Sequence, residues 1–442
     1  MNKKYLFLVL LMLLYFLVRI PFYGIALFYE EGCFTELFYN HMVNPDYIFW
    51  AKIDGVKLYH APLHPALIYE IISSYGKLWQ VLVPPLASWN TIALGVFARF
   101  AFSLIQASIV FALILMLLKQ NEAKTPLPLI ALIMGFCLMS PAILYSTSLQ
   151  VDGSVGSLLT GLLVLSLLAY RYKLIETRKS LLLVFACAMF YGFGKNEWTL
   201  AFLVALMVSF IFVLIRKSAF TGNFRSAISL LSYAFGGLLV GNLISYSFDP
   251  INYMGGFGTA GNLGQPSLNI FEIMTWSRWK LVSLNLILSV AALAGLYHAL
   301  KKLDVLCLLL FVWGAALLAG FFITAHATDI RYYAPSFLVL LGILPLAYDQ
   351  FDSRRAYPVL VAATVIIFLF SVPKIIDGVQ TLRALKKVDL YVTQVVPAMI
   401  DCIPRKDQGE VWITGEDFIA STAWPEYASS FVQKYGKTLC KP

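Results

Sequence analysis

The chain has 442 residues, of which 60% are hydrophobic and 13% are charged. Soluble domains contain about a quarter charged residues, so this composition excludes a water-soluble globule and predicts an all-α polytopic membrane protein. The formal net charge is +9 at pH 7. The basic residues lie mainly in connecting segments, where they report membrane topology, so we expect a lipid bilayer and no nucleic acid as a partner.

Eleven apolar segments are predicted to form membrane spans. The first follows Lys3 and Lys4 directly and is longer than the apolar core of a secretion signal. No small-residue cleavage site precedes Arg19, so we expect this segment to be retained as a helix. The predicted spans are roughly 5–23, 90–118, 126–146, 153–170, 180–194, 197–215, 226–247, 279–299, 303–324, 332–348 and 356–373.

The loops predict the orientation of these spans. With a cytoplasmic N-terminus, the cytoplasmic loops hold most of the loop Lys and Arg residues, whereas the much longer loops on the other side hold few. Every alternate loop follows this positive-inside pattern. We therefore expect a cytoplasmic N-terminus and an external segment after the last span.

Two internal segments on the outer side are too long to be simple connectors. Residues 24–89 interleave aromatic and polar residues, which is typical of juxtamembrane helices at the headgroup layer. Residues 248–278 are rich in Gly and Asn. They predict a lid-like loop that orders over a site, or alternatively a plain connector.

The last part of the chain differs from the rest. Residues 374–442 are polar and predict a small external domain beside a transmembrane module formed by residues 1–373. The tail contains Cys402 and Cys440. Disulfides persist outside the cytoplasm, so these two cysteines either pair or remain free.

Ionisable residues gather at the predicted outer ends of the spans. Such groups are costly at membrane depth and are therefore candidates for function. They are Glu30, Glu31, His60, His64, Arg99, Asp152, Lys195, Glu197, His326, Asp329 and Arg331. Acids and bases on one side of a membrane predict a site there, although a surface loop with scattered acids is an alternative for residues 24–89.

The segments EEG at 30–32 and HAPLHP at 60–65 carry a resemblance to a known family. They resemble motifs of the GT-C membrane glycosyltransferases, in the branch of the protein O-mannosyltransferases and the aminoarabinose transferase of lipid A. In that family an Asp-Glu pair follows the first helix, and a Lys or His precedes Pro-Leu later in the same loop. Glu30 and Glu31 match the acidic pair, and His60 matches the basic residue. The first acid is usually Asp in the family and is Glu here.

Further motifs follow in the family's order on the predicted outer side. Arg99 in FARFAFS resembles an arginine early in the family's second span, and Asp152 in LQVDGSVG resembles an acid before the fourth span. Lys195 in GFGKNEW resembles a Gly-x-x-Lys turn. Arg331 and Tyr332 in RYYAP resemble the Arg-Tyr-x-x-Pro opening of a late helix. The C-terminal tail is not covered.

The resemblance covers about residues 15–345 and implies an inverting-type glycosyltransferase. Such an enzyme moves a monosaccharide from a polyprenyl-phosphate donor to an envelope acceptor, on the outer face of a bacterial inner membrane. The acceptor stays open among lipid A, O-antigen, another glycan and a protein. The implied catalytic residues are Glu30, Glu31 and Asp152, and the implied donor-phosphate and substrate-binding residues are His60, Arg99, Lys195, Arg331 and Tyr332.

No cofactor follows from these motifs. Glu31, Asp152 and His326 form an alternative set of ligands for a divalent metal ion, without the tight spacing of a known metal motif. Structural alternatives also stay open: Arg99 as the partner of an acid in the bundle, and Lys195 with Glu197 as a snorkelling pair.

Two other classes of function remain. A transporter or flippase of a lipid-linked sugar would also need external charges, but transporters carry them near mid-span and often show internal repeats. A polymerase or ligase of envelope polysaccharide usually has its large external loop late in the chain. The chain has neither a GxxxxGK[ST] loop nor GxGxxG after a strand, so nucleotide-driven chemistry has no sequence support.

Overall fold

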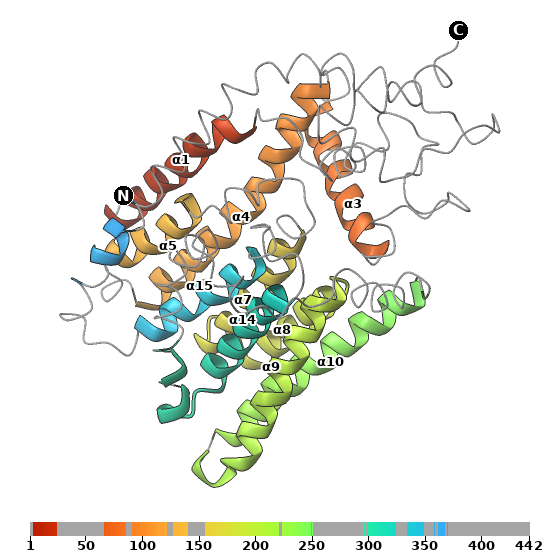
Figure 1. Cartoon of the computed structure of the whole chain (residues 1–442), viewed down its shortest axis with the longest axis vertical. Coiled ribbons are helices and arrows are strands. Elements are labelled where there is room, and N and C mark those ends of the chain that lie inside the picture. Colours follow the sequence, from red (N-terminus) through yellow and green to blue (C-terminus); the bar gives the residue numbers. More distant parts are fainter. Residues whose placement is uncertain are drawn as a thin grey trace.

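The computed structural model describes residues 3–23, 66–84, 91–121, 127–139, 155–220, 223–248, most of 293–323, 334–348 and part of 358–369. Every regular element in these ranges is helical, which confirms the predicted all-α class for this part of the chain (Figure 1). The helices are α1 (Lys3–Tyr23), α3 (Ala66–Leu82), α4 (Thr91–Asn121), α5 (Leu127–Met139), α7 (Ser157–Arg171), α8 (Thr177–Tyr191), α9 (Asn196–Ile215), α10 (Phe224–Phe248), α14 (Val305–Ile323) and α15 (Ala334–Tyr348), with a 3-10 turn at Lys217–Ala219.

All of these helices except α3 begin within a few residues of a predicted span. In the described ranges, three stretches are long and apolar enough to cross a membrane: Phe97–Lys119, Asn196–Ile215 and Phe224–Phe248. In contrast, α7 and α8 have 15 residues each. They are about 22 Å long, less than the ~30 Å hydrocarbon layer. The count of eleven spans therefore stays a prediction.

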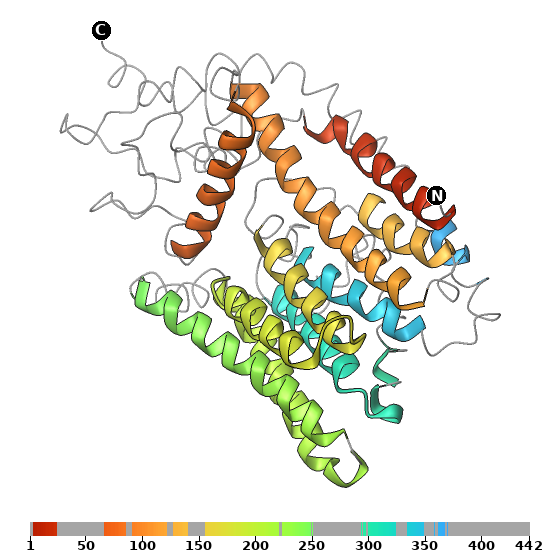
Figure 2. The same ribbon diagram turned by 180° about the vertical axis from the view of Figure 1, so that it is seen from behind.

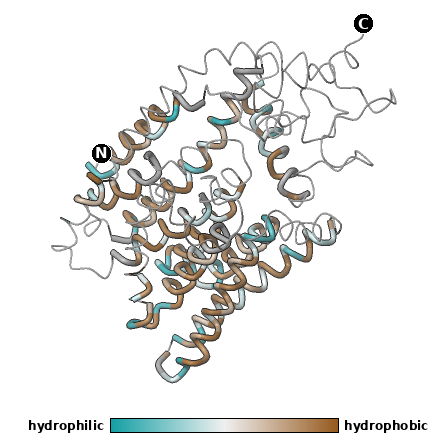
Figure 3. Tube along the Cα trace, in the orientation of Figure 1, coloured by the Kyte–Doolittle hydropathy of each residue, from teal (hydrophilic) through white to brown (hydrophobic). Residues whose placement is uncertain are grey.

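The outward faces of the helices are apolar. Leu200, Met207, Ile211 and Ile215 recur at helical spacing on α9, and all four are more than half exposed. Figure 3 shows that apolar residues occupy most of the length of the helices. An apolar surface of this kind is unfavourable in water and suits lipid. The described residues thus belong to a helical membrane protein.

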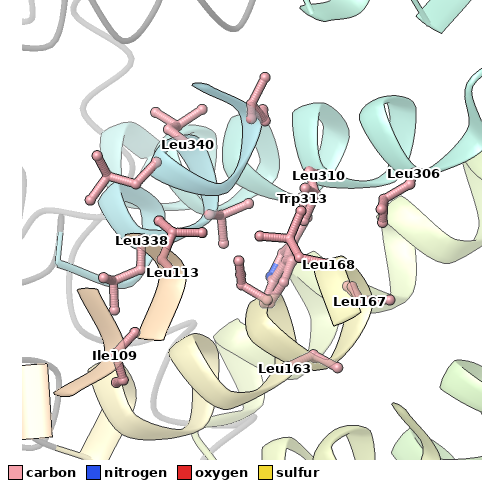
Figure 4. Close-up of a cluster of buried hydrophobic side chains, with 14 of the residues drawn as sticks. Ile109, Leu113, Leu163, Leu167, Leu168, Leu306, Leu310, Trp313, Leu338 and Leu340 are labelled. Atoms are coloured by element: carbon pink, nitrogen blue, oxygen red, sulfur yellow. The ribbon is translucent and has the colours of Figure 1, made fainter. Parts of the chain in front are cut away.

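Helix α7 occupies the centre of the bundle, as both views show (Figures 1 and 2). It contacts α4, α8 and α15. On one side α1 packs against α4 and α5, and on the other α10 covers α8 and α9. The shared core lies where α4, α7, α14 and α15 meet (Figure 4); it includes Ile109, Leu113, Leu163, Leu167, Leu168, Leu306, Leu310, Trp313, Leu338 and Leu340.

Glycines bring α8 and α10 into backbone contact. A Cβ atom on Gly237 would overlap the carbonyl oxygen of Phe185, and one on Gly241 would overlap that of Met189. Two glycines four residues apart are a common device for close helix packing in lipid. This pairing makes α8 and α10 a parallel unit that supports the turn after α8.

The two ends of the bundle differ in chemistry. At one end, called here the Arg171 end, Arg171 at the C-terminus of α7 donates to Asp304 at 2.8 Å. Asp304 also accepts from the backbone N–H groups of Leu306 and Cys307, at 3.1 and 3.2 Å, and so caps α14. The opposite end, called the Trp198 end, holds the described candidates for function.

Candidate functional site

The turn between α8 and α9 carries Lys195. The N–H of Gly194 donates to the carbonyl of Tyr191 at 2.9 Å, which closes the turn, and the carbonyl of Lys195 accepts from Thr199 at 3.1 Å, which starts α9. Gly192 is required by space, because a Cβ there would lie 2.9 Å from the carbonyl oxygen of Leu238 on α10. Lys195 is thereby fixed at the first residue before α9.

Trp198, on the first turn of α9, lies at the meeting point of three helix starts. A Cβ atom on Gly156, directly before α7, would lie 2.7 Å from Cη2 of Trp198 and 3.3 Å from Cγ of Pro335 in α15. A Cβ on Gly194 would lie 2.7 Å from Cε3 of the same indole. The starts of α7, α9 and α15 therefore meet around one buried ring.

This meeting point is close in sequence to several of the motifs. Lys195 belongs to it directly. Asp152 precedes Gly156 by four residues, and Arg331 and Tyr332 precede Pro335 by four and three. Asp152, Arg331 and Tyr332 themselves lie outside the described residues.

Lys195 is an interior group. Its side chain is 9% exposed, and its ammonium lies 5.8 Å from the centroid of the Trp198 ring. Glu197, two residues later in the chain, is exposed. The two side chains therefore lie in different environments, and the lysine faces the bundle.

Arg99 reaches the same region from α4. It is 3% exposed and shares one face of α4 with Ser103 and Gln106, at helical spacing. Gln106 donates to the hydroxyl of Ser157 at 3.5 Å, and Ser157 follows Gly156 in the chain. The polar face of α4 thus touches the first turn of α7.

Arg19 and Tyr15 belong to the same polar region and were missed by sequence reasoning. Arg19 is fully buried, with its guanidinium carbon 3.5 Å from the centroid of the Tyr15 ring. The Tyr15 hydroxyl lies 3.1 Å from the Ser103 carbonyl and 3.3 Å from Oε1 of Gln106. In the sequence, Arg19 looked like the ordinary end of an apolar span. A Tyr and an Arg four residues apart lie on the same face of a helix, and this spacing within an apolar run could have indicated a buried polar pair.

Two long helices, α4 and α14, continue beyond the level of Ser157 and Trp198. Past Gln106, α4 extends to Thr91, about 22 Å along its axis, and past Trp313, α14 extends to Ile323, about 15 Å. The starts of α7, α9 and α15 are therefore recessed below the ends of α4 and α14. Lys195 lies at the level of the recessed starts.

Glu30, Glu31, His60 and His326 lie outside the described residues, as do the lid-like loop 248–278, apart from its first residues, and the tail with Cys402 and Cys440. Within the described ranges, no three His, Cys, Asp or Glu residues gather as a metal site would require. The predicted metal ligands Glu31, Asp152 and His326 are all outside those ranges.

Comparison with protein-family models, with curated proteins and with solved structures finds no match to this chain. The described part of the site is therefore interpreted from its own residues, the buried Lys195 and Arg99 at the Trp198 end.

Proposed function

We propose that this protein is an integral-membrane glycosyltransferase that uses a polyprenyl-phosphate monosaccharide as donor. The observation that carries the proposal is the contact of Gly156, Trp198 and Pro335. It supports the idea that the segments with Asp152, Lys195, Arg331 and Tyr332 act together. Motifs spread over nearly two hundred residues of sequence would then serve one site.

The cations suit the leaving group of such a reaction. As the bond from the anomeric carbon to the phosphate oxygen breaks, negative charge grows on the lipid phosphate and is stabilised by fixed cations. Lys195 and Arg99 are buried at the Trp198 end, where the low dielectric strengthens their interaction with an anion. In this proposal His60, Arg331 and Tyr332 complete the phosphate site.

The acids suit the attacking group. The acceptor oxygen forms the new bond to the anomeric carbon, its proton passes to a carboxylate, and the electron pair of the broken bond leaves with the phosphate. Glu30 is the proposed base, with Glu31 and Asp152 as its neighbours in the site. Attack opposite the leaving phosphate inverts the anomeric carbon.

The proposed site lies on the outer side of the membrane. The Arg171 end holds Arg171, Lys173, Arg178, Lys179, Arg216, Lys217, Arg225, Lys301 and Lys302 at helix ends. This excess favours a cytoplasmic Arg171 end and a Trp198 end on the outer face of a bacterial inner membrane. Donor and envelope acceptor would both be reached from that face.

The test is sugar transfer from radiolabelled polyprenyl-phosphate donors in membranes that contain wild-type protein, Glu30→Gln or Glu176→Gln. Loss of the general base should lower the rate by about 100-fold or more. Glu176→Gln is the matched control, because Glu176 is exposed at the Arg171 end and pairs with Lys179 at 3.4 Å; its rate should equal that of wild type.

Other outcomes would redirect the proposal. Full activity of Glu30→Gln would move the base to Glu31 or Asp152. An absence of transfer with every donor, together with labelled lipid crossing the bilayer, would contradict the transferase and favour the flippase.

A further inference from the structure

Three buried aromatic residues connect α8, α9 and α14 beneath Lys195. The indole N–H of Trp313 donates to the hydroxyl oxygen of Tyr191 at 3.1 Å, and that hydroxyl donates to the carbonyl of Trp198 at 3.2 Å. Tyr191 and Trp313 are fully buried, and Trp198 is 4% exposed. The first turn of α9 is thereby tied to two other helices.

The Trp198 ring has little freedom to move. Gly156 and Gly194 approach it so closely that a Cβ on either would overlap the indole, and Pro335 lies next to Gly156. The ammonium of Lys195 lies 5.8 Å from the same ring. A cation within about 6 Å of a Trp ring is attracted by its π face.

We propose that Trp198 and Tyr191 are positioning residues that hold the Lys195 ammonium for the phosphate of a lipid-linked anion. Trp198 restrains the flexible lysine through its ring, and the Tyr191 hydroxyl restrains the first turn of α9, which Lys195 directly precedes. Restraint before binding improves affinity, because less side-chain freedom is lost when the anion arrives. The identity of the anion rests on the proposed function.

The position of the hydroxyl distinguishes this role from simple packing. The Tyr191 ring already packs edge to face on Trp313, with centroids 5.2 Å apart, and on Phe202 at 5.6 Å. Its hydroxyl, however, donates to the carbonyl of Trp198, three residues after Lys195. Tyr191→Phe keeps the ring contacts and removes this hydrogen bond, together with the one that the hydroxyl accepts from the Trp313 indole.

The experiment measures binding of two probes to the purified full-length protein in detergent: a polyprenyl monophosphate and the uncharged polyprenol of the same chain length. Their affinity ratio isolates the interaction with the phosphate. Lys195→Met should lower this ratio by about ten-fold or more, and Trp198→Phe and Tyr191→Phe by about three- to five-fold. Tyr170→Phe is the control, since it removes a tyrosine hydroxyl that bonds to Ser226 at the Arg171 end; its ratio should not change.

The double variant Lys195→Met with Tyr191→Phe provides the decisive comparison. If Tyr191 acts through Lys195, the second substitution adds nothing to the phosphate preference once the lysine is gone. Additive losses would overturn the inference, as would an equal loss of phosphate and polyprenol binding in Tyr191→Phe. A wild-type protein without preference for the phosphate would count against the donor site itself. A preference that depends on Lys195 alone would overturn only the positioning role.

Discussion

At the scale of single residues, the Trp198 end is defined by polar side chains buried in an apolar bundle. Arg19 and Tyr15 of α1 meet Ser103 and Gln106 of α4, and Gln106 continues the chain of contacts to α7. Most buried polar groups in proteins are satisfied by hydrogen-bond partners, and the Tyr15 hydroxyl has two here. The set therefore fixes the angle between α1 and α4, next to the first turn of α7.

This linkage predicts the effect of Tyr15→Phe. The substitution leaves Ser103 and Gln106 without the tyrosine hydroxyl and should lower stability by about 1 kcal/mol. Tyr297→Phe is the control, because Tyr297 is 66% exposed and its hydroxyl accepts from the exposed Lys301 at 3.4 Å. Thermal unfolding midpoints of both variants in the same detergent measure the difference. Equal midpoints would contradict a structural role for the Tyr15 hydroxyl.

At the scale of helices, hydropathy predicted where most elements begin, because apolar length is a direct consequence of the bilayer. It could not predict which helices touch. The contact of Trp198 with Gly156 depends on α7 being recessed between α4 and α15, and no local pattern specifies that neighbour. The order of the motifs indicated only that Lys195 and Asp152 lie on the same side of the membrane. The role of Arg19 was missed for the same reason, because no local pattern specifies which helices are neighbours.

Helix contacts also allow a prediction about α8 and α10. Gly241→Ala should destabilise the protein by about 1–3 kcal/mol, because the new methyl group overlaps the carbonyl of Met189. Gly236→Ala, on the same helix, meets only Phe185 at 3.5 Å and should be neutral or stabilising, since Ala is the better helix former. Thermal unfolding in detergent separates the two. Similar losses for both would show that the backbone contact does not decide the packing.

At the scale of the whole molecule, the two ends of the bundle differ in where their basic residues lie. Those at the Arg171 end are mainly exposed, whereas Lys195 and Arg99 at the Trp198 end are buried. The Arg171 end carries exposed lysines such as Lys173, while α3 at residues 66–82 belongs to the predicted outer loop and exposes Lys77. The apolar flanks between them suit lipid. Orientation in the membrane then decides from which side the site is reached.

The orientation can be measured with two lysine positions. In a background without native cysteines, Lys77→Cys should react with a membrane-impermeant maleimide in intact spheroplasts, and Lys173→Cys only after lysis. Both lysines are exposed, so reactivity reports sidedness and not burial. The reverse pattern would contradict the proposed topology and place the Trp198 end in the cytoplasm.

The shortness of α8 has a consequence for the surrounding lipid. This helix exposes Leu182, Leu183 and Phe190 and is about 8 Å shorter than the hydrocarbon layer that these side chains face. A bilayer adapts to a short apolar face by thinning beside it. We therefore expect headgroups next to α8 to be drawn inward toward the turn that bears Lys195. A lipid phosphate there would come toward the level of the lysine while its tails stay in their own leaflet.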